Sequence, residues 1–559
     1  MVDAGGGGIE VDVAVVGAGI GGCYVSLRLL EAVRTGQFHT TTPLRSSART
    51  RPVTVALFEV SDRIGGRLHS IQLPGVPDVW ADLGGMRFHR QLHLVCDLIR
   101  YVGFEQFITS FFFDRPENLT YVRGVRLRLH ELTIAASDRL PYRLRPQERG
   151  RNGVGLGFLA AESALPGFFA LYRRHHAAQS RFDWSEADAV TADYAHVRES
   201  ARVAGRRLLD QEWSAVLEHT LSAEAMCLIE DTGGYDCRQW TGNAANWLDL
   251  LFHTPPDVEY LRLSTGFESL PRAVHARFHA GGGRTFLRHR LQRLDRARLR
   301  DGSEGYRLTF QLAEVGSAGR YTTVEAKVVL LALPHNALRS LDSDTFIFAC
   351  PIVRVALDAV KAVPAYKLFL VYPAPWWKQV GVSSGRSTTD LPLRQLWYWG
   401  TATESYRTDR QAMLLAAYPS GSAVRLWDKH FRDRDLHMPA ALDDSAAVQI
   451  SEVQHAHAMV MRLHGVTRAP PPIAARWQDW PNPDGAWHVW RPGYDSRQII
   501  PRIRRPSRRD AVFIVSDCWT GDPGSVNGTL SSAESVLQYH LGLTWPDWLR
   551  RDGTYLIPT

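Results

Sequence analysis

The chain has 559 residues, 45% hydrophobic and 22% charged, an ordinary globular composition at a length that predicts two or three interleaved domains. Its net charge of +7 comes from arginines spread along the chain among acids, with no nucleic-acid-binding motif, so nucleic-acid binding is not expected. Six scattered cysteines, an N-terminus without a signal-peptide pattern and no apolar run near about 18 residues predict no metal site, no membrane association and a cytoplasmic location.

The first predicted element is a β-branched strand at residues 11–16, followed by a helix from residue 22. The link between them, Gly17-Ala-Gly-Ile-Gly-Gly22, matches G-x-G-x-x-G in the required strand-to-helix context. The first glycine permits a tight turn, the second lets the backbone approach a pyrophosphate, and the third lets helix and strand pack closely. The link therefore predicts a dinucleotide-binding turn, with the helix N-terminus facing the phosphates.

A second predicted strand, residues 53–59, ends at Glu59, whose carboxylate would accept ribose hydroxyls. This acid comes later than the usual spacing, and the polar, turn-rich stretch 36–52 accounts for the delay as a surface loop.

The rest of the chain mixes helical and strand-like patterns. Residues from about 90 to 255 are mostly helical in pattern, with arginine-rich polar faces, and we expect them to cover a substrate cavity. The later predicted elements are a helix at 265–274, strands at 284–294 and 327–334, a separate sheet within 340–480, a core strand at 513–517 and a closing helix from 527. Pieces of one nucleotide-binding fold are therefore expected at both ends and in the middle.

Several motifs carry a family resemblance. Glu59-Val-Ser-Asp-Arg-Ile-Gly-Gly-Arg67 resembles the E-x-x-x-R-x-G-G-R run of flavin amine oxidases, and Asp82-Leu-Gly-Gly-Met-Arg-Phe88 is similar to a segment of L-amino acid oxidases. Ser387-Thr-Thr-Asp-Leu-Pro-Leu-Arg394 resembles a run of the venom L-amino acid oxidases, and the segment 515–530 is similar to the family's flavin-closing motif. The chain thus resembles the L-amino acid oxidase branch of the flavin amine oxidase superfamily, with patterns near those of bacterial L-tryptophan oxidases.

This resemblance implies three catalytic residues. Arg87 would form a bidentate pair with the substrate α-carboxylate, and Tyr418 would donate its hydroxyl to the same group. Lys367, one of five lysines against sixty arginines, matches the family lysine that holds a water near flavin N5. Arg87 and Tyr418 together would separate an amino-acid oxidase from a simple amine oxidase.

The resemblance also implies a non-covalent FAD, because Trp487 stands where covalent relatives carry a cysteine. Asp517 would bond a ribityl hydroxyl, and the amide of Val526 would face flavin N1 and O2. Ser525 departs from the pattern, since the family usually has an aromatic wall of the substrate pocket there. The expected FAD-binding residues are Gly17, Gly19, Ile20, Gly21, Gly22, Glu59, Arg67, Gly84, Gly85, Met86, Arg87, Leu291, Asp517, Ser525 and Val526.

The fold class expected from these elements is α/β. A Rossmann-like FAD-binding domain of the GR2 type would interleave with a mixed-sheet substrate domain and a helical domain. The expected segments are FAD-binding at 9–90, 256–340 and 496–545, a helical cover at 91–255, a substrate-binding domain at 341–495 and a C-terminal tail at 546–559.

The predicted function is FAD-dependent oxidative deamination of an L-amino acid, large and aromatic such as tryptophan, or cationic, with O2 reduced to H2O2. Three alternatives stay open: a flavin amino-acid monooxygenase that gives an amide, a polyamine or protein-amine oxidase, and a catalytically silent flavin-bound scaffold whose basic surface recruits a partner. The expected partners are the amino-acid substrate, O2 and a second copy of the chain in a homodimer.

Overall fold

The computed structural model describes residues 9–38, 53–134, 139–235, 241–256, 258–312, 320–401, 410–427, 446–481 and 485–549. Residues 39–52 of the predicted surface loop and 550–559 of the predicted tail lie outside the described residues.

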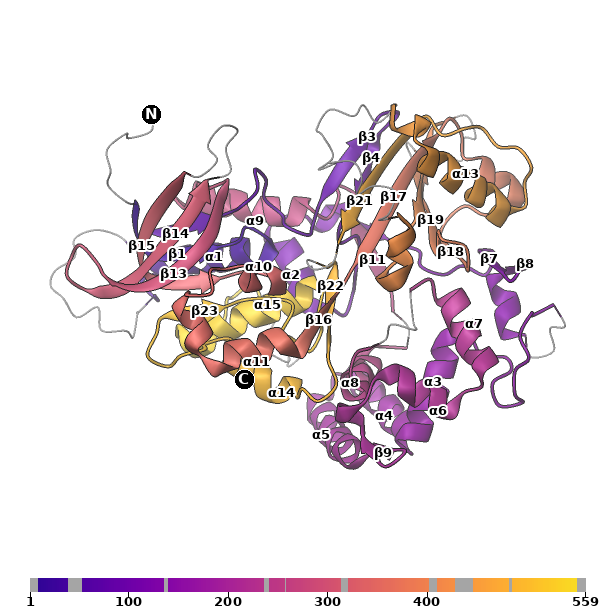
Figure 1. Ribbon diagram of the computed structural model, residues 1–559, viewed down its shortest axis with the longest axis horizontal. Helices are drawn as coiled ribbons and strands as arrows, with labels where there is room; N and C mark the ends of the chain where they lie inside the picture. The colour runs from indigo at the N-terminus through magenta and orange to yellow at the C-terminus, as the bar shows by residue number, and fades with distance from the viewer. Residues whose placement is uncertain are drawn as a thin grey trace.

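One seven-stranded sheet forms the nucleotide-binding side of the molecule, on the left in Figure 1. Its order is β12-β2-β1-β15-β14-β13, with β23 also paired to β15, and β1 runs parallel to both β2 and β15. The strands are β1 (Ile9–Val16), β2 (Val55–Phe58), β12 (Arg284–Phe286), β13 (His289–Arg298), β14 (Glu304–Leu312), β15 (Tyr321–Leu331) and β23 (Val512–Ile514). Segments from the start, middle and end of the chain thus meet in one sheet, as the sequence predicts.

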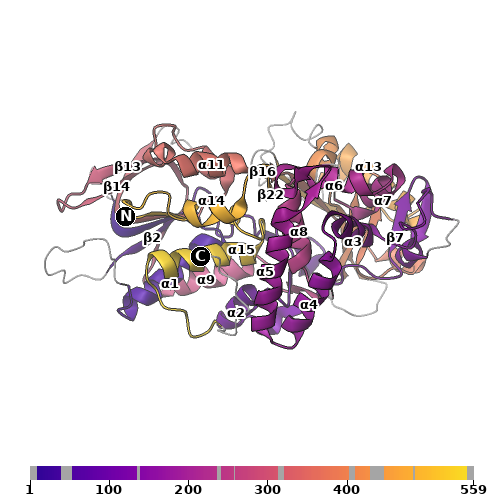
Figure 2. The ribbon, with the colours of Figure 1, turned by 90° about the horizontal axis from the view of Figure 1, so that it is seen from below.

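Helices bury the apolar strands of this sheet. The helix after the glycine turn, α1, contacts both α9 and α15, and these three run together in Figure 2. The helices of this part are α1 (Ile20–Arg34), α2 (His93–Tyr101), α9 (Ser269–Ala280), α10 (His335–Arg339), α11 (Pro351–Ala359), α14 (Ser496–Ile503) and α15 (Val526–Ser535). Helix α11 belongs to the segment 341–495 that was expected to form the substrate-binding domain. Its apolar residues pack instead into the core of the nucleotide-binding part.

A second seven-stranded sheet has the order β21-β17-β20-β19-β18-β7-β8. Its strands are β7 (Leu119–Val122), β8 (Val125–Arg128), β17 (Ala365–Tyr372), β18 (Arg386–Thr389), β19 (Gln395–Thr401), β20 (Ala412–Ala417) and β21 (Ala474–Trp480). Alternate residues of β17 face opposite sides: Leu368 and Leu370 pack toward helix α13 (Ser451–His464), whereas Phe369 and Val371 pack toward the hairpin β3 (Ser70–Leu73) and β4 (Val76–Asp82). Burial of both faces explains why β17 reads as a continuous apolar run.

The expected helical cover at 91–255 is helical mainly over residues 153–253. Its helices are α3 (Gly153–Ala164), α4 (Phe168–Ser180), α5 (Trp184–Ser200), α6 (Trp213–Thr220), α7 (Ala223–Gly233) and α8 (Ala244–His253). Before them, β7 and β8 form a hairpin that joins the second sheet through β18. Positive φ at both Arg123 (50°) and Gly124 (79°) makes the tight turn. The hairpin escaped prediction because its strands have four residues each and arginine rarely adopts this conformation.

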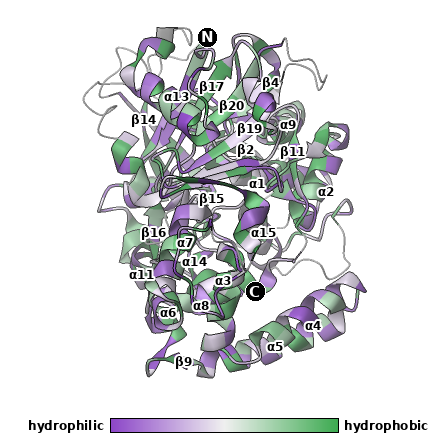
Figure 3. Cartoon of the chain, turned by 90° about the vertical axis from the view of Figure 1, so that its right-hand side faces the viewer, coloured by the Kyte–Doolittle hydropathy of each residue, from purple (hydrophilic) through white to green (hydrophobic). Residues whose placement is uncertain are grey.

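The remaining strands are β5 (Phe88–His89), β6 (Ile108–Ser110), β9 (Arg202–Val203), β10 (Arg206–Arg207), β11 (Tyr260–Leu263), β16 (Val360–Val363) and β22 (Trp487–Trp490). Figure 3 shows α4 and α5 side by side at one edge, with hydrophilic and hydrophobic residues mixed along both. No single helix among the described residues has the length and apolarity to cross a membrane. Helices α3 and α4 meet both criteria only when taken together, and the pair is bent by 114°.

Candidate functional site

A cavity of about 1060 Å³ lies against both large sheets. Ligand sites are generally about 300–1,000 Å³, so this volume suits a large cofactor together with a substrate. Of the predicted site residues, those that line the cavity are Gly17, Gly19, Ile20, Gly21, Glu59, Arg67, Gly84, Gly85, Met86, Arg87, Leu291, Lys367, Tyr418, Asp517, Ser525 and Val526. Gly22 is not part of the wall: a Cβ there would come 1.7 Å from the carbonyl oxygen of Gly17, so it serves close packing of turn and helix.

The glycine turn forms a cradle suited to a diphosphate. Gly17 has φ +102°, and a Cβ on it would meet the carbonyl oxygen of Ala332 at 2.4 Å. Helix α1 begins at Ile20 without a side-chain cap and without an acid in its first turn, so its first N–H groups are free for an anion. The segment Gly65-Gly66 packs against the same turn, because the Gly65 N–H donates to the Ala18 carbonyl at 2.9 Å. The turn therefore presents the N-terminus of α1 to the cavity, as an anion site requires.

Glu59 follows β2 directly and is buried at the cavity edge. Its Oε2 accepts a hydrogen bond from the Ala18 N–H at 2.7 Å, and its Oε1 accepts from the Ser61 hydroxyl at 2.8 Å. These bonds fix the carboxylate beside the glycine turn, where the sequence predicts a ribose contact.

Arg67 and Asp517, predicted separately as cofactor ligands, form an ion pair with each other. Arg67 Nη1 donates to Asp517 Oδ2 at 2.9 Å and to the Ala486 carbonyl at 3.1 Å, and Arg67 Nη2 donates to Asp517 Oδ1. Burial alone would raise the pKa of the Asp517 carboxyl, but the guanidinium holds it below its usual range. Asp517 is therefore an anion that faces the cavity from a fixed position.

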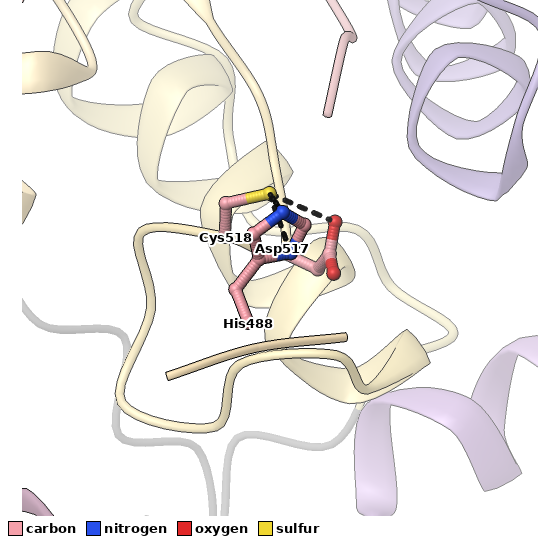
Figure 4. A group of neighbouring side chains, drawn as sticks. All are labelled: His488, Asp517 and Cys518. Atoms are coloured by element: carbon pink, nitrogen blue, oxygen red, sulfur yellow. Dashed lines mark hydrogen bonds between the residues drawn. The ribbon is translucent and has the colours of Figure 1, made fainter. Parts of the chain in front are cut away.

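Asp517 also belongs to a buried cluster with His488 and Cys518, shown in Figure 4. The ligand atoms of the three side chains lie within 4.8 Å of one another, and Cys518 Sγ lies 3.3 Å from His488 Nδ1. Burial lowers the pKa of His488 to about 3 and raises that of the Cys518 thiol, so both are neutral at pH 7. Sequence spacing gave no signal of this cluster, because His488 comes from β22 while the other two follow β23.

Lys367 lies in β17 with 2% of its surface exposed. Its Nζ donates to the carbonyls of Gly84 at 2.6 Å and Asp82 at 2.9 Å, and it lies 4.9 Å from the ring centroid of Tyr418. Burial lowers the pKa of Lys367 to about 7, and burial raises the pKa of the Asp82 carboxyl to about 6. The Gly-Gly-Met-Arg segment and the lysine strand, far apart in sequence, are thus joined directly at the cavity.

The Arg87 guanidinium lies among aromatic rings. Its Cζ is 4.8 Å from the centroid of Phe113, 5.3 Å from Tyr260, 5.5 Å from Trp397 and 5.9 Å from Phe111. No carboxylate forms an ion pair with it within the described residues, and Nη2 donates instead to the Tyr235 hydroxyl at 3.2 Å. A cation that faces a cavity without an anion is suited to bind an anionic ligand.

Ser525 has a structural reason for its departure from the family pattern. It is the N-cap of α15, and its hydroxyl accepts a hydrogen bond from the Gly528 N–H at 2.8 Å. A Cβ on the preceding Gly524 would meet Trp487 Cβ at 2.4 Å, so the indole of Trp487 packs over this small residue and lines the cavity. An aromatic ring is thus present at this end of the cavity, but it comes from β22.

Sequence reasoning missed Tyr235, which follows α7 in a region without motif signals. Among the tryptophans near the site, Trp480 lines the cavity and Trp397 flanks Arg87, whereas Trp519 donates to the Ala356 carbonyl at 2.8 Å within the core.

Three comparisons with known proteins agree with this geometry. A family model described as flavin containing amine oxidoreductase matches residues 47–536. Achacin of Lissachatina fulica is 26% identical over 532 residues, which cover 90% of this chain and 88% of its own length. The L-amino-acid oxidase of Mus musculus is 23% identical over 491 residues, 86% of this chain and 63% of its own. A triple mutant of putrescine oxidase has a TM-score of 0.60 at 15% identity, covering 96% of this chain and 100% of that chain, which shows a shared fold.

Proposed function

The chain belongs to the flavin-containing amine oxidoreductase family, and we propose that it catalyses the FAD-dependent oxidative deamination of an L-amino acid. The observation that carries this proposal is Arg87: its guanidinium faces the cavity without an ion-pair partner among the described residues. A carboxylate-free amine would leave this cation uncompensated, whereas the α-carboxylate of an amino acid satisfies it. Relatives named as L-amino-acid oxidases support the same substrate class.

The residues of the chain would position the substrate for reaction. Arg87 and Tyr418 hold the carboxylate, and this fixes the Cα hydrogen relative to the cofactor. When bound without a covalent link, FAD would supply the two-electron oxidation of the substrate to an imino acid and the reduction of O2 to H2O2. The resulting imino acid hydrolyses to a 2-oxo acid and ammonia.

Lys367, which lines the same cavity as Arg87 and Tyr418, would order a water molecule there. Its Nζ is held by two carbonyls, so the position of its proton is fixed, and a pKa of about 7 leaves both protonation states accessible near neutral pH. The aromatic rings around Arg87 exclude water and strengthen its attraction for the carboxylate.

Anaerobic titration of the yellow holoprotein with the common amino acids tests the proposal. We expect at least one L-amino acid to bleach the flavin absorbance, and we expect H2O2 when air is admitted. Bleaching by amines without a carboxylate, and by no amino acid, would overturn it in favour of an amine oxidase.

A further inference from the structure

Tyr235 reaches the site from the helical region. It follows α7 directly after Gly234, which turns the chain with a φ of +77°. A Cβ on Gly234 would meet the side chain of Gln395, the first residue of β19, at 2.3 Å. The Tyr235 hydroxyl then accepts the hydrogen bond from Arg87 at 3.2 Å. A residue of the cover is thereby bonded to the guanidinium on which the proposed function depends.

The ring of Tyr235 also contacts the two other aromatic residues at this end of the cavity. Its centroid lies 5.9 Å from that of Tyr418 and 6.0 Å from that of Trp487, and both contacts are edge-to-face at 79° and 87°. Both neighbours line the cavity. The Tyr235 side chain therefore contacts both Arg87 and Tyr418, the two side chains proposed to hold a carboxylate.

Arg87 donates to this hydroxyl, and the Tyr418 ring lies beside the Tyr235 ring, with centroids 5.9 Å apart. The Gln395 amide nitrogen, by contrast, donates to the carbonyls of Gly234 and Tyr418, each at 3.2 Å. Burial would raise the pKa of the Tyr235 phenol, but Arg87 lowers it below its ordinary value. Arg386, which is also close, already has its own carboxylate, Asp114, at 3.1 Å. The Arg87 guanidinium, which here donates to an uncharged oxygen, would be better satisfied by a negatively charged one.

We propose that the Tyr235 hydroxyl occupies the position of a substrate carboxylate oxygen in the free protein, and that an amino acid must displace it from Arg87 to bind. This inference rests on the proposed function, because it assigns a carboxylate to Arg87. Displacement is favourable because a carboxylate brings a negative charge and accepts two hydrogen bonds from a guanidinium, whereas the uncharged phenol accepts one. Tyr235 therefore lowers the affinity of the free protein for a carboxylate, whereas a neutral ligand gains too little from Arg87 to displace it and binds without that contact.

Equilibrium binding of propionate, with propionamide as its uncharged counterpart, tests this by calorimetry on the holoprotein. The variant Tyr235→Phe keeps the ring and removes the competing oxygen, so we expect propionate to bind roughly three- to tenfold more tightly. Propionamide affinity should stay within about twofold. Tyr235→Leu should also tighten propionate binding, whereas a role for the ring alone would leave Tyr235→Phe at the wild-type value.

Two control variants distinguish failure of this inference from failure of the proposed function. Tyr539→Phe, at a tyrosine with 54% of its surface exposed, should change neither affinity. Arg87→Ala should abolish the preference for propionate over propionamide. If it does so while Tyr235→Phe binds propionate no more tightly than wild type, the inference is wrong and the proposed function stands. If Arg87→Ala leaves the preference intact, or no protein binds propionate, both are overturned.

Discussion

At the residue scale, Arg87 has the clearest consequence for activity. Replacing it with alanine removes two charge-assisted hydrogen bonds to the carboxylate, so we expect kcat/KM for amino acids to fall by about 100-fold or more. Steady-state assays of H2O2 formation measure this. Arg90→Ala is the matched control, because that arginine lies three residues on with 63% of its side chain exposed and pairs with Glu259. Equal losses of kcat/KM in the two variants would contradict the proposal that Arg87 binds the substrate carboxylate.

Lys367 predicts a pH dependence of stability. Its pKa is about 7 in the folded protein against an ordinary 10.5, so between these values the unfolded chain binds a proton that the native protein does not. Unfolding free energy therefore rises with pH in this window, by about 1.4 kcal/mol per pH unit from this group, and the gain is absent below pH 7.

Urea denaturation of the holoprotein and of Lys367→Met at several pH values between 7 and 10 isolates this contribution. The stability of wild type relative to the variant should increase across the window. Parallel curves for the two proteins would show that Lys367 titrates normally.

At the element scale, helix α15 depends on its cap. Ser525→Ala loses the hydrogen bond to the Gly528 N–H, and we expect a loss of about 1 kcal/mol of unfolding free energy. Ser525→Thr keeps the hydroxyl and should retain most of the stability. Thermal unfolding of both variants measures the difference; a threonine variant as unstable as the alanine variant would argue against capping.

The glycine turn makes a stronger prediction. Gly22→Ala would bring a Cβ within 1.7 Å of the Gly17 carbonyl oxygen, so strand β1 and helix α1 cannot keep their contact. We expect the variant to purify without flavin, as absorbance at visible wavelengths will show. Gly157→Ala in α3 is the control, because no atom lies within 4 Å of its added Cβ and it should keep its flavin.

The elements also show what the sequence can and cannot reveal. The glycine turn, Glu59 and the strand of Lys367 were predictable because each follows local rules of turn geometry or apolar patterning. Gly22 was expected both among the cofactor-binding residues and as the glycine that lets helix and strand pack closely, and the close contact is present. Tyr235 was not predictable, since its role comes from a contact between α7 and the second sheet that no sequence period records. The hairpin β7–β8 was missed because its strands are short and its turn uses an arginine, and its pairing with β18 joins residues more than 250 positions apart.

At the scale of the whole molecule, the cavity is where the two sheets meet. Its wall takes Gly17 and Val526 from the nucleotide-binding part and Lys367 and Tyr418 from the second sheet. Neither sheet is formed from one continuous stretch of chain, so the two parts share segments as well as a cavity. A ligand that fills this space therefore contacts both parts at once.

This arrangement predicts that FAD stabilises the whole chain. Because FAD would contact the native walls and not the unfolded chain, FAD at about 100 times its dissociation constant should add about 2.7 kcal/mol of unfolding free energy. Calorimetry of the flavin-free protein with and without FAD measures this as a rise in Tm. AMP, which resembles only the nucleotide end, is the control and should raise Tm less, since it cannot reach Lys367 and Tyr418. Equal shifts with AMP and FAD would mean that the second sheet contributes nothing to cofactor binding.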